Sequence, residues 1–282
     1  MNLYFKPAVG GSLIELDYKP IAYNLLDILS RREEGYHRRL MTKGGKLDDS
    51  SNVHDSVLVK EIGLENHLHF DWYRHASLVD HFFSPPTTLE MYSQCKYLEL
   101  GDFVNQPYKH KVDLENDGVK ITLQRDGALW FDNVPHRISV QKVVRYTNGK
   151  TEFTVDYTIT NRESHPVDIW FGVEFSVGLM AGDAHDRYYN IEKRALDDKR
   201  LRSTGSEKSV KRFSLVDEWL GIETTFTLKQ AATLWRHPIE TVSLSEAGFE
   251  RIYQCSIVTP NWHTKLNKEV RYQIVQKVRN LR

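Results

Sequence analysis

Apolar and polar residues alternate along most of the chain after about residue 89. The segments 119–124, 153–159 and 166–177 each place an apolar side chain at every second position. A period of two is typical of a β-strand with one buried face. The turn sequences AsnAspGly (116–118), ArgAspGly (125–127) and ThrAsnGlyLys (147–150) punctuate these runs. Many strands joined by turns predict a mainly β protein, with a large antiparallel β-sandwich over residues 89–282.

Residues 1–88 predict an N-terminal segment that contains helix and is continuous with the sandwich. Two short strands, 3–5 and 12–17, flank Gly10–Gly11 and read as a hairpin. Leucines at helical spacing, after Pro20, predict one long helix over 19–42, with Arg31 and its charged neighbours on the solvent side. Residues 46–52 predict a surface loop and 54–65 a short helix. A domain seldom begins inside a hairpin, so we expect a truncated N-terminus.

Composition excludes several classes of function. The chain has 282 residues, 40% of them hydrophobic and 27% charged, which is ordinary for a soluble globular protein. Lys plus Arg equals Asp plus Glu, 38 each, so nothing indicates a nucleic-acid partner. No apolar stretch approaches the roughly 20 residues of a membrane span, and no signal peptide is recognisable, so we expect a cytoplasmic protein without a membrane partner. Cys95 and Cys255 could form one disulfide, but two buried thiols are favoured.

The segment 166–177 carries the most suggestive chemistry. Its apolar residues point to one face, whereas Trp170 and Glu174 share the other face, about 13 Å apart, with Gly172 between them. An aromatic platform, an open space and a carboxylate would suit a sugar. The alternative is that this face packs on another layer or domain, with Glu174 paired to an arginine. The candidate carbohydrate-binding residues are Trp170, Glu174, Trp235 and Trp262, although a place in the β core is the favoured interpretation for any single aromatic.

Two polar segments could hold an ion, but neither has diagnostic spacing. The stretch 67–83 contains His67, His69, His75 and His81. Its structural alternative is that Asp71, Arg74, Asp80 and His81 satisfy one another. In the segment 182–189, Asp183, His185 and Asp186 could bind calcium or act as acid and base, or could cap a strand end. We therefore predict no metal site, no cofactor and no catalytic residue.

Four segments, in order, resemble the C-terminal β-sandwich of the α-amylase/4-α-glucanotransferase enzymes in glycoside hydrolase family 57. They begin with GlyGlySerLeuIleGluLeuAspTyrLysPro and continue through LeuLeuAspIleLeuSerArgArgGluGluGlyTyrHis. The others include LysGluIleGlyLeuGlu with AspTrpTyrArgHisAlaSerLeuValAspHisPhe, PheGlyValGluPhe, and ThrValSerLeuSerGluAlaGlyPheGluArgIleTyrGln. The matching ranges are 10–20, 25–37, 60–65, 71–82, 171–189 and 234–254.

The resemblance implies a galactose-mutarotase-like fold and a role in α-1,4-glucan hydrolysis or transfer. In that family the catalytic carboxylates belong to an N-terminal (β/α)₇ barrel, whose motifs are absent here. The chain is then a non-catalytic module, either a fragment or a separate gene product, with the barrel and α-glucan oligosaccharides as partners. The alternative is an independent mutarotase-like sugar-binding or epimerising protein. Segments 19–42 and 67–83 are expected to dock the barrel, with candidate interface residues Glu15, Asp17, Trp72, Arg74, Asp80 and His81.

Overall fold

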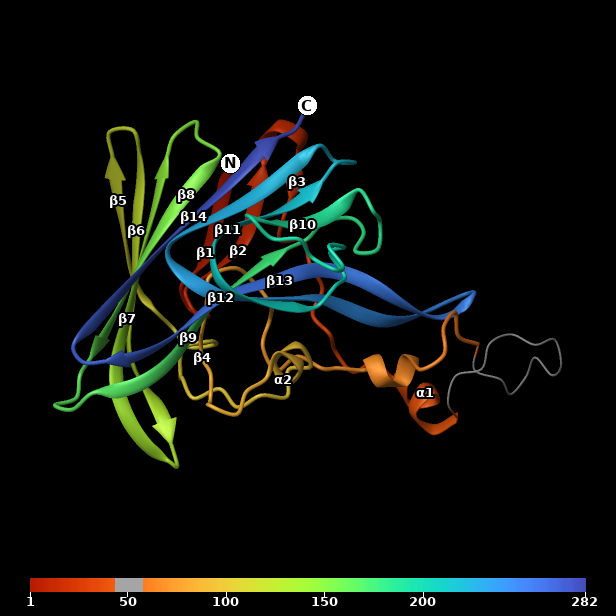
Figure 1. Cartoon of the computed structure of the whole chain (residues 1–282), viewed down its shortest axis with the longest axis horizontal. Helices are drawn as coiled ribbons and strands as arrows, with labels where there is room; N and C mark the ends of the chain where they lie inside the picture. Colours follow the sequence, from red (N-terminus) through yellow and green to blue (C-terminus); the bar gives the residue numbers. More distant parts are fainter. Residues whose placement is uncertain (44–57) are drawn as a thin grey trace.

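The structure is a computed structural model that describes residues 1–43 and 58–282, most of them in antiparallel strands (Figure 1). Within the described residues, two 3-10 helices and two short α-helices interrupt the strands. In chain order the elements are β1 (Asn2–Lys6), β2 (Ser12–Tyr18), the 3-10 helix η1 (Lys19–Ile21), β3 (Tyr23–Asn24), α1 (His37–Lys43), the 3-10 helix η2 (Leu64–His67), β4 (Val79–Phe82), α2 (Leu89–Ser93), β5 (Lys109–Glu115), β6 (Gly118–Phe131), β7 (Val134–Thr147), β8 (Glu152–Asn161), β9 (Val167–Val177), β10 (Arg187–Ile191), β11 (Gly205–Asp217), β12 (Ile222–Ser245), β13 (Gly248–Leu266) and β14 (Glu269–Asn280).

The strands confirm the predicted antiparallel β-sandwich. One hydrogen-bonded path runs β4-β9-β13-β12-β14-β8-β7-β6-β5, and β10 and β11 join it at β12. The 24-residue β12 pairs with β14 through residues 222–228 and with β13 through residues 233–245. A long strand that changes partners in this way connects the two layers. Figure 1 shows β5 to β8 fanning out at one end and the β12–β13 hairpin projecting toward α1 at the other.

The N-terminal segment is built into the sandwich. β1 and β2 pair as the predicted hairpin, and Gly10 and Gly11 have positive φ angles of 63° and 54°, which glycine adopts readily. β4 pairs with β9 in the large sheet. Leu13 and Leu16 belong to the same buried cluster as the strands of the sandwich. Residues 1–88 and 89–282 thus share a core, and the division near residue 88 stays a prediction.

The predicted helix over 19–42 is wrong. Only η1 and α1 are helical; Ala22, with φ of 51°, ends η1, and the Asn24 side chain accepts a hydrogen bond from the Leu26 amide at 2.8 Å. Leu25 runs between two strands: its amide donates to Leu16 O and its carbonyl accepts from Gly178 N. Burial of two adjacent leucines by an irregular segment therefore imitates a helical stripe. Arg31, expected in solvent, is buried.

Two smaller predictions also fail. The sequence ArgAspGly (125–127) lies inside β6 and makes no turn; Gly127 is needed there because a Cβ atom would lie 2.2 Å from Asp102 Oδ1. The charged sequence of residues 183–209 interrupts the strand alternation and predicts a loop or excursion, but the structure has β10 and the start of β11 there. Two predictions fall outside the described residues: the loop 46–52 and the first part of the helix 54–65. The described part of that predicted helix begins with a β-bridge between Val59 and Phe249.

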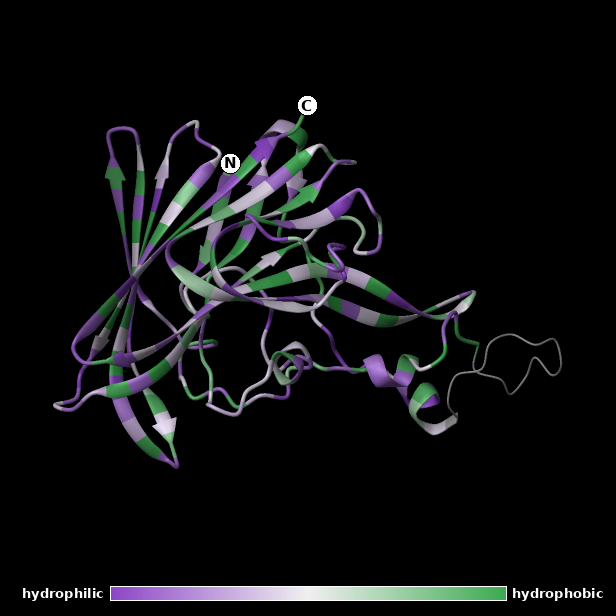
Figure 2. Cartoon of the chain, viewed as in Figure 1, coloured by the Kyte–Doolittle hydropathy of each residue, from purple (hydrophilic) through white to green (hydrophobic). Residues whose placement is uncertain are grey.

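Alternation along the strands is visible as hydrophilic and hydrophobic bands in Figure 2. In β9, Val167, Ile169, Phe171 and the following alternate residues are buried, as predicted. The two cysteines are free and buried, which confirms the favoured prediction of two thiols. Within the described part of the chain, no helix has the length and apolar character needed to cross a membrane.

Candidate functional site

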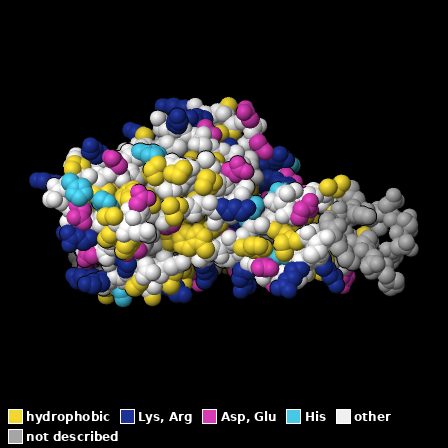
Figure 3. All heavy atoms as spheres, turned by 90° about the horizontal axis from the view of Figure 1, so that it is seen from below, with side chains coloured by type: hydrophobic (Ala, Val, Ile, Leu, Met, Phe, Trp, Pro, Cys, Tyr) yellow, Lys and Arg dark blue, Asp and Glu magenta, His cyan; other side chains and the backbone are white. Residues whose placement is uncertain are grey.

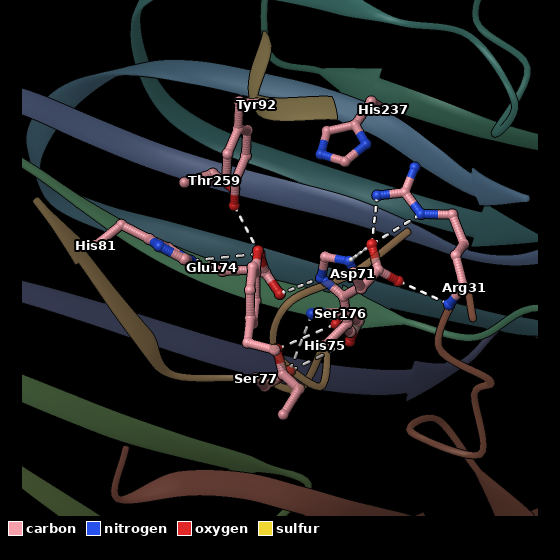
Figure 4. Close-up of polar contacts among 12 residues, drawn as sticks. Arg31, Asp71, His75, Ser77, His81, Tyr92, Glu174, Ser176, His237 and Thr259 are labelled. Carbon is pink, nitrogen blue, oxygen red and sulfur yellow. Dashed lines mark hydrogen bonds and ion pairs between the residues drawn. The ribbon is translucent and has the colours of Figure 1, made fainter. Parts of the chain in front are cut away.

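Glu174, on β9, is the centre of a buried group of ionisable side chains (Figure 4). Its Oε2 accepts hydrogen bonds from the hydroxyls of Tyr73 and Tyr92, both at 2.6 Å. Its Oε1 lies 2.9 Å from Nδ1 of His75, and its Oε2 lies 3.4 Å from Nε2 of His81. Both carboxylate oxygens are therefore occupied by groups of this chain.

The space expected beside Glu174 is filled. A Cβ atom on Gly172 would lie 2.6 Å from Phe83 Cε2, so the Phe83 ring takes the place of the predicted opening. The predicted alternative, in which this face of the strand packs on another layer, is correct for Gly172 and Glu174. The partners of Glu174 are histidines and tyrosines instead of the expected arginine.

The histidines extend this centre in two directions. His75 Nε2 lies 3.2 Å from Asp71 Oδ1, and Asp71 is held by the Arg31 guanidinium at 2.6 Å and by the Arg31 amide at 2.7 Å. His81 Nδ1 lies 2.9 Å from Glu99 Oε2. We call the resulting row of alternating charges the ionic chain; it consists of Arg31, Asp71, His75, Glu174, His81 and Glu99.

The ionic chain keeps both histidines protonated. Burial alone would lower the pKa of His75, but the Glu174 charge and the hydrogen bonds to Asp71 and Glu174 raise it to about 9. Burial likewise opposes protonation of His81, and hydrogen bonds to Glu174 and Glu99 raise its pKa to about 9. Against the cost of burial, His75 and Arg31 lower the pKa of Asp71 to about 2. A fixed row of ion pairs results.

This geometry does not support sugar epimerisation at Glu174. A mutarotase-type mechanism needs a neutral histidine base and an acid that reach the same sugar. Here both neighbouring histidines are cationic at neutral pH, and Glu174, His75 and His81 are fully or almost fully buried. The sequence did not predict that His75 and His81 contact Glu174. The course of segment 71–83 brings them together, and no characteristic residue spacing indicates these contacts.

Trp170 lies at a surface cavity, which we call the Trp170 pocket. The cavity has a volume of about 380 Å³. The Trp170 indole stacks on His263 with ring centroids 4.1 Å apart, and its Nε1 donates to Asn261 Oδ1 at 2.9 Å. The lining combines apolar rings with a few polar groups, and includes Phe83, Pro85, Phe131, Asp168, Thr264 and Lys265. Such a combination is typical of small-molecule sites.

The other two candidate tryptophans do not share this surface. Trp235 is buried and packs against Trp170, with ring centroids 5.2 Å apart. Trp262 is buried, stacks on Tyr272 at 4.2 Å and donates its Nε1 hydrogen to Ala231 O. Of the four candidate carbohydrate-binding residues, Trp170 alone lines the pocket, and Glu174 lies behind it in the interior.

The candidate interface residues divide into surface and interior groups. Trp72 and Arg74 are exposed, and Glu15 and Asp17 are half-buried. Asp17 accepts a hydrogen bond from the Asn2 side chain at 3.2 Å. Asp80 is fully buried, 3.0 Å from Lys142 Nζ and 2.6 Å from the Tyr108 hydroxyl. His81 belongs to the ionic chain. The expectation that Asp71, Arg74, Asp80 and His81 satisfy one another is therefore wrong, because their partners come from other segments.

The acidic segment 182–186 is engaged in surface ion pairs. Asp183 Oδ1 lies 3.1 Å from Arg200 and its Oδ2 lies 3.1 Å from Arg202. Asp186 lies 3.0 Å from Arg187. Over residues 1–43 and 58–282, no group of three or more His, Cys, Asp or Glu side chains is arranged to hold a metal ion.

The architecture recurs in proteins of the galactose-mutarotase class. A galactose mutarotase-like protein from Clostridium acetobutylicum superposes with a TM-score of 0.54 over 99% of this chain and 92% of that protein, at 9% sequence identity. At this identity the similarity establishes the fold alone. It confirms the predicted galactose-mutarotase-like β-sandwich.

Sequence comparison assigns the family. The family described as "Alpha-amylase/4-alpha-glucanotransferase, C-terminal" matches residues 1–275, so the chain belongs to this family. Alpha-amylase 1 of Dictyoglomus thermophilum is 33% identical over 261 residues, which are 90% of this chain and 35% of that enzyme. The crystal structure of 4-alpha-glucanotransferase from Thermococcus litoralis has a TM-score of 0.73 and 28% identity, and the match covers 98% of this chain and 35% of that chain.

The chain thus spans about a third of the length of these relatives. The match confirms the resemblance found in the sequence, and it identifies this chain as a C-terminal domain of the α-amylase/4-α-glucanotransferase type. The match covers one domain of each relative, so the activity of the whole enzyme is not assigned to this chain by the match.

Proposed function

We propose that this chain is a non-catalytic module of an α-1,4-glucan-processing enzyme, and that it contacts both the glucan and a (β/α)₇ catalytic barrel. The observation that carries the proposal is the coverage of its relatives: two enzymes named for α-glucan chemistry contain this domain within about a third of their length. The burial of Glu174, His75 and His81 agrees with a module that leaves the chemistry to another domain.

The Trp170 pocket is the proposed contact with glucan. An indole face offers an apolar surface to a sugar ring, and Asp168, Thr264 and Lys265 offer hydrogen-bonding groups around it. The pocket volume of about 380 Å³ lies within the range of ligand sites, roughly 300–1,000 Å³. Candidate residues Trp235 and Trp262 then act as support and core and do not touch the sugar.

Calorimetric titration with maltoheptaose tests this contact. Trp170→Ala should weaken binding at this site on the order of tenfold, since removal of an aromatic anchor costs more than about 1 kcal/mol. Asp168→Ala, which changes an exposed side chain, should weaken it without disturbing the core. Trp130→Ala is the matched control, because Trp130 is exposed but lies outside the lining of the pocket, between Leu129 and Phe131. Equal affinities for all three variants would reject the contact.

The proposed barrel-docking face surrounds Trp72. Figure 3 shows hydrophobic side chains gathered near the middle of the face on which α2 lies, with charged groups around them. Trp72 is 45% exposed and Leu98 is 62% exposed. The ring of Tyr97, the neighbour of Leu98, lies 6.2 Å from the Trp72 ring, so the two exposed side chains belong to adjacent segments. A contiguous exposed apolar patch rimmed by polar groups is typical of protein interfaces.

Sedimentation of the chain mixed with the separately expressed barrel tests the docking face. We expect association, and we expect the double substitution Trp72→Ser with Leu98→Ser to weaken it at least tenfold. Leu114→Ser on β5 is the control, because Leu114 is 83% exposed and lies on a different element. Absence of association for the unmodified chain would remove the docking proposal. The buried free thiols agree with a reducing, cytoplasmic location, which we include in the proposal.

A further inference from the structure

A second groove lies apart from the Trp170 pocket and shares none of its lining residues. It is formed by two cavities of about 180 and 110 Å³. Arg31, His67, His69 and Glu240 line both cavities, so the cavities adjoin and form one groove. Its walls come mainly from the segment that leads into α1, from η2 and the residues after it, from the segment between β10 and β11, and from strands β12 and β13. We call it the β12 groove.

One end of the β12 groove is polar and close to charge balance. Arg202 lies 3.5 Å from Glu240, and Arg251 lies 3.2 Å from the same carboxylate. Arg31 is paired with Asp71, Arg202 also with Asp183, and Arg251 also with Glu61. Since each guanidinium already faces a carboxylate, the groove holds no excess of positive charge for an anion. It offers donors and acceptors side by side.

Two histidines of the groove carry buried ring nitrogens without a hydrogen-bond partner in the described structure: Nδ1 of His69 and Nε2 of His237. His237 is almost fully buried, and its ring lies between Tyr92 and the Arg31 guanidinium (Figure 4). Burial and the nearby Arg31 charge lower the pKa of His69 to about 4 and that of His237 to about 3. Both rings are thus neutral. Nδ1 of His237 donates to the Pro238 carbonyl at 3.2 Å, so its Nε2 is left as a hydrogen-bond acceptor, whereas His69 can donate one hydrogen bond and accept another.

The smaller cavity adds apolar side chains to the polar lining of the groove. Phe70 is 38% exposed and Leu29 is 60% exposed, and both line the smaller cavity together with Tyr36. The Phe70 ring lies 5.9 Å from the His37 ring. An exposed aromatic ring next to paired arginine and glutamate groups matches a ligand with apolar faces and hydroxyls at its rim.

We propose that the β12 groove is a second carbohydrate-binding site, which takes a short oligosaccharide. Sugar hydroxyls both donate and accept, so they satisfy guanidinium, carboxylate and neutral imidazole together. An isolated phosphate would instead meet arginines that are already neutralised. The inference does not depend on glucan binding at the Trp170 pocket.

Calorimetry on the full chain with Trp170→Ala tests the groove in isolation. Maltotriose should still bind, and adding Arg202→Gln or Phe70→Ala should weaken that binding at least tenfold. Arg271→Gln is the matched control, because Arg271 is exposed, lies outside the lining of the groove and pairs with Glu269 nearby on β14. If Trp170→Ala abolishes all maltotriose binding, or if the groove variants bind as well as the control, the proposal is overturned.

A second measurement does not depend on the folding of any variant. In the unmodified chain, ¹⁵N resonances of the His69 and His237 rings should shift on addition of maltotriose and stay unchanged with inorganic phosphate. A response to phosphate alone would make the groove an anion site and would overturn the proposal. Maltotriose binding that depends on Arg202 and not on Trp170 would reject the glucan contact at the Trp170 pocket and would support the site in the β12 groove.

Discussion

Raising the pH from 6.5 to 9 should destabilise this domain through the ionic chain. His75 faces Asp71, Glu174 and the Tyr73 ring, and His81 faces Glu99, Glu174 and three tyrosines. Both histidines are held protonated by these carboxylates. A group whose pKa is higher in the folded state stabilises the protein below its unfolded pKa and loses that effect as the pH rises through its folded pKa.

The magnitude follows from the two pKa values. Each histidine has a pKa of about 9 in the folded protein, against 6.5 for an ordinary histidine. Since a tenfold change in proton affinity corresponds to about 1.4 kcal/mol, each histidine contributes about 3 kcal/mol below pH 6.5. The pair contributes less than twice this amount, because both histidines share Glu174 and their titrations are coupled. Most of the contribution is lost between pH 6.5 and pH 9.

The assay is urea unfolding at half-unit steps from pH 6 to pH 9, with the free energy of unfolding taken from midpoints and slopes. Glu174→Gln should flatten this decline and should also lower the stability at pH 6.5 by roughly 3–5 kcal/mol, because it leaves buried cations without their shared anion. Glu163→Gln, at an exposed ion pair, is the control for loss of a carboxylate. A stability that stays constant to within 1 kcal/mol across the pH range would refute the protonated state of the histidines.

Three further predictions concern the interior. Asp80→Asn leaves the buried Lys142 ammonium without its anion and should cost roughly 3–5 kcal/mol in urea unfolding of this chain by itself; a cost below 1 kcal/mol would contradict the intramolecular role. Gly172→Val forces a side chain into the Phe83 ring and should cost about 1–3 kcal/mol, part of which Phe83→Leu should restore; additive losses would argue against the contact. Burial raises the pKa of Cys95 to about 12, so its thiol should react with Ellman's reagent only after denaturation, and rapid reaction of the native protein would disagree.

The strands were predictable because their alternation reflects burial of one face. In β9 the odd-numbered residues from 167 to 177 lie in the core as predicted. What alternation does not show is whether the second face is also covered. From Phe171 onward β9 is buried on both faces. A glutamate in an alternating pattern predicts a surface position, so the sequence does not reveal that Glu174 is the buried centre of the ionic chain.

The irregular segments were not predictable for a different reason. Leu25 and Leu26 belong to the main buried cluster, and the Leu25 backbone bonds to Leu16 and Gly178. These partners come from other parts of the chain, so no helical period in the sequence reflects them. Asn24 was the local signal against a continuous helix, since Asn side chains commonly bond the backbone two residues on. His75 and His81 gave no signal, because no regular element sets their separation.

The ionic chain explains how irregular segments can form a defined surface. Segments 25–36 and 60–100 have few strand hydrogen bonds, and their ordering costs conformational entropy that a sheet ladder does not offset there. Arg31, Asp71, Glu99 and the two histidines tie these segments to β9 through Glu174. Trp72 directly follows Asp71, and Leu98 directly precedes Glu99. The side chains of the proposed docking face are therefore attached next to the most tightly held points of their segments, which reduces the ordering still required when a partner binds.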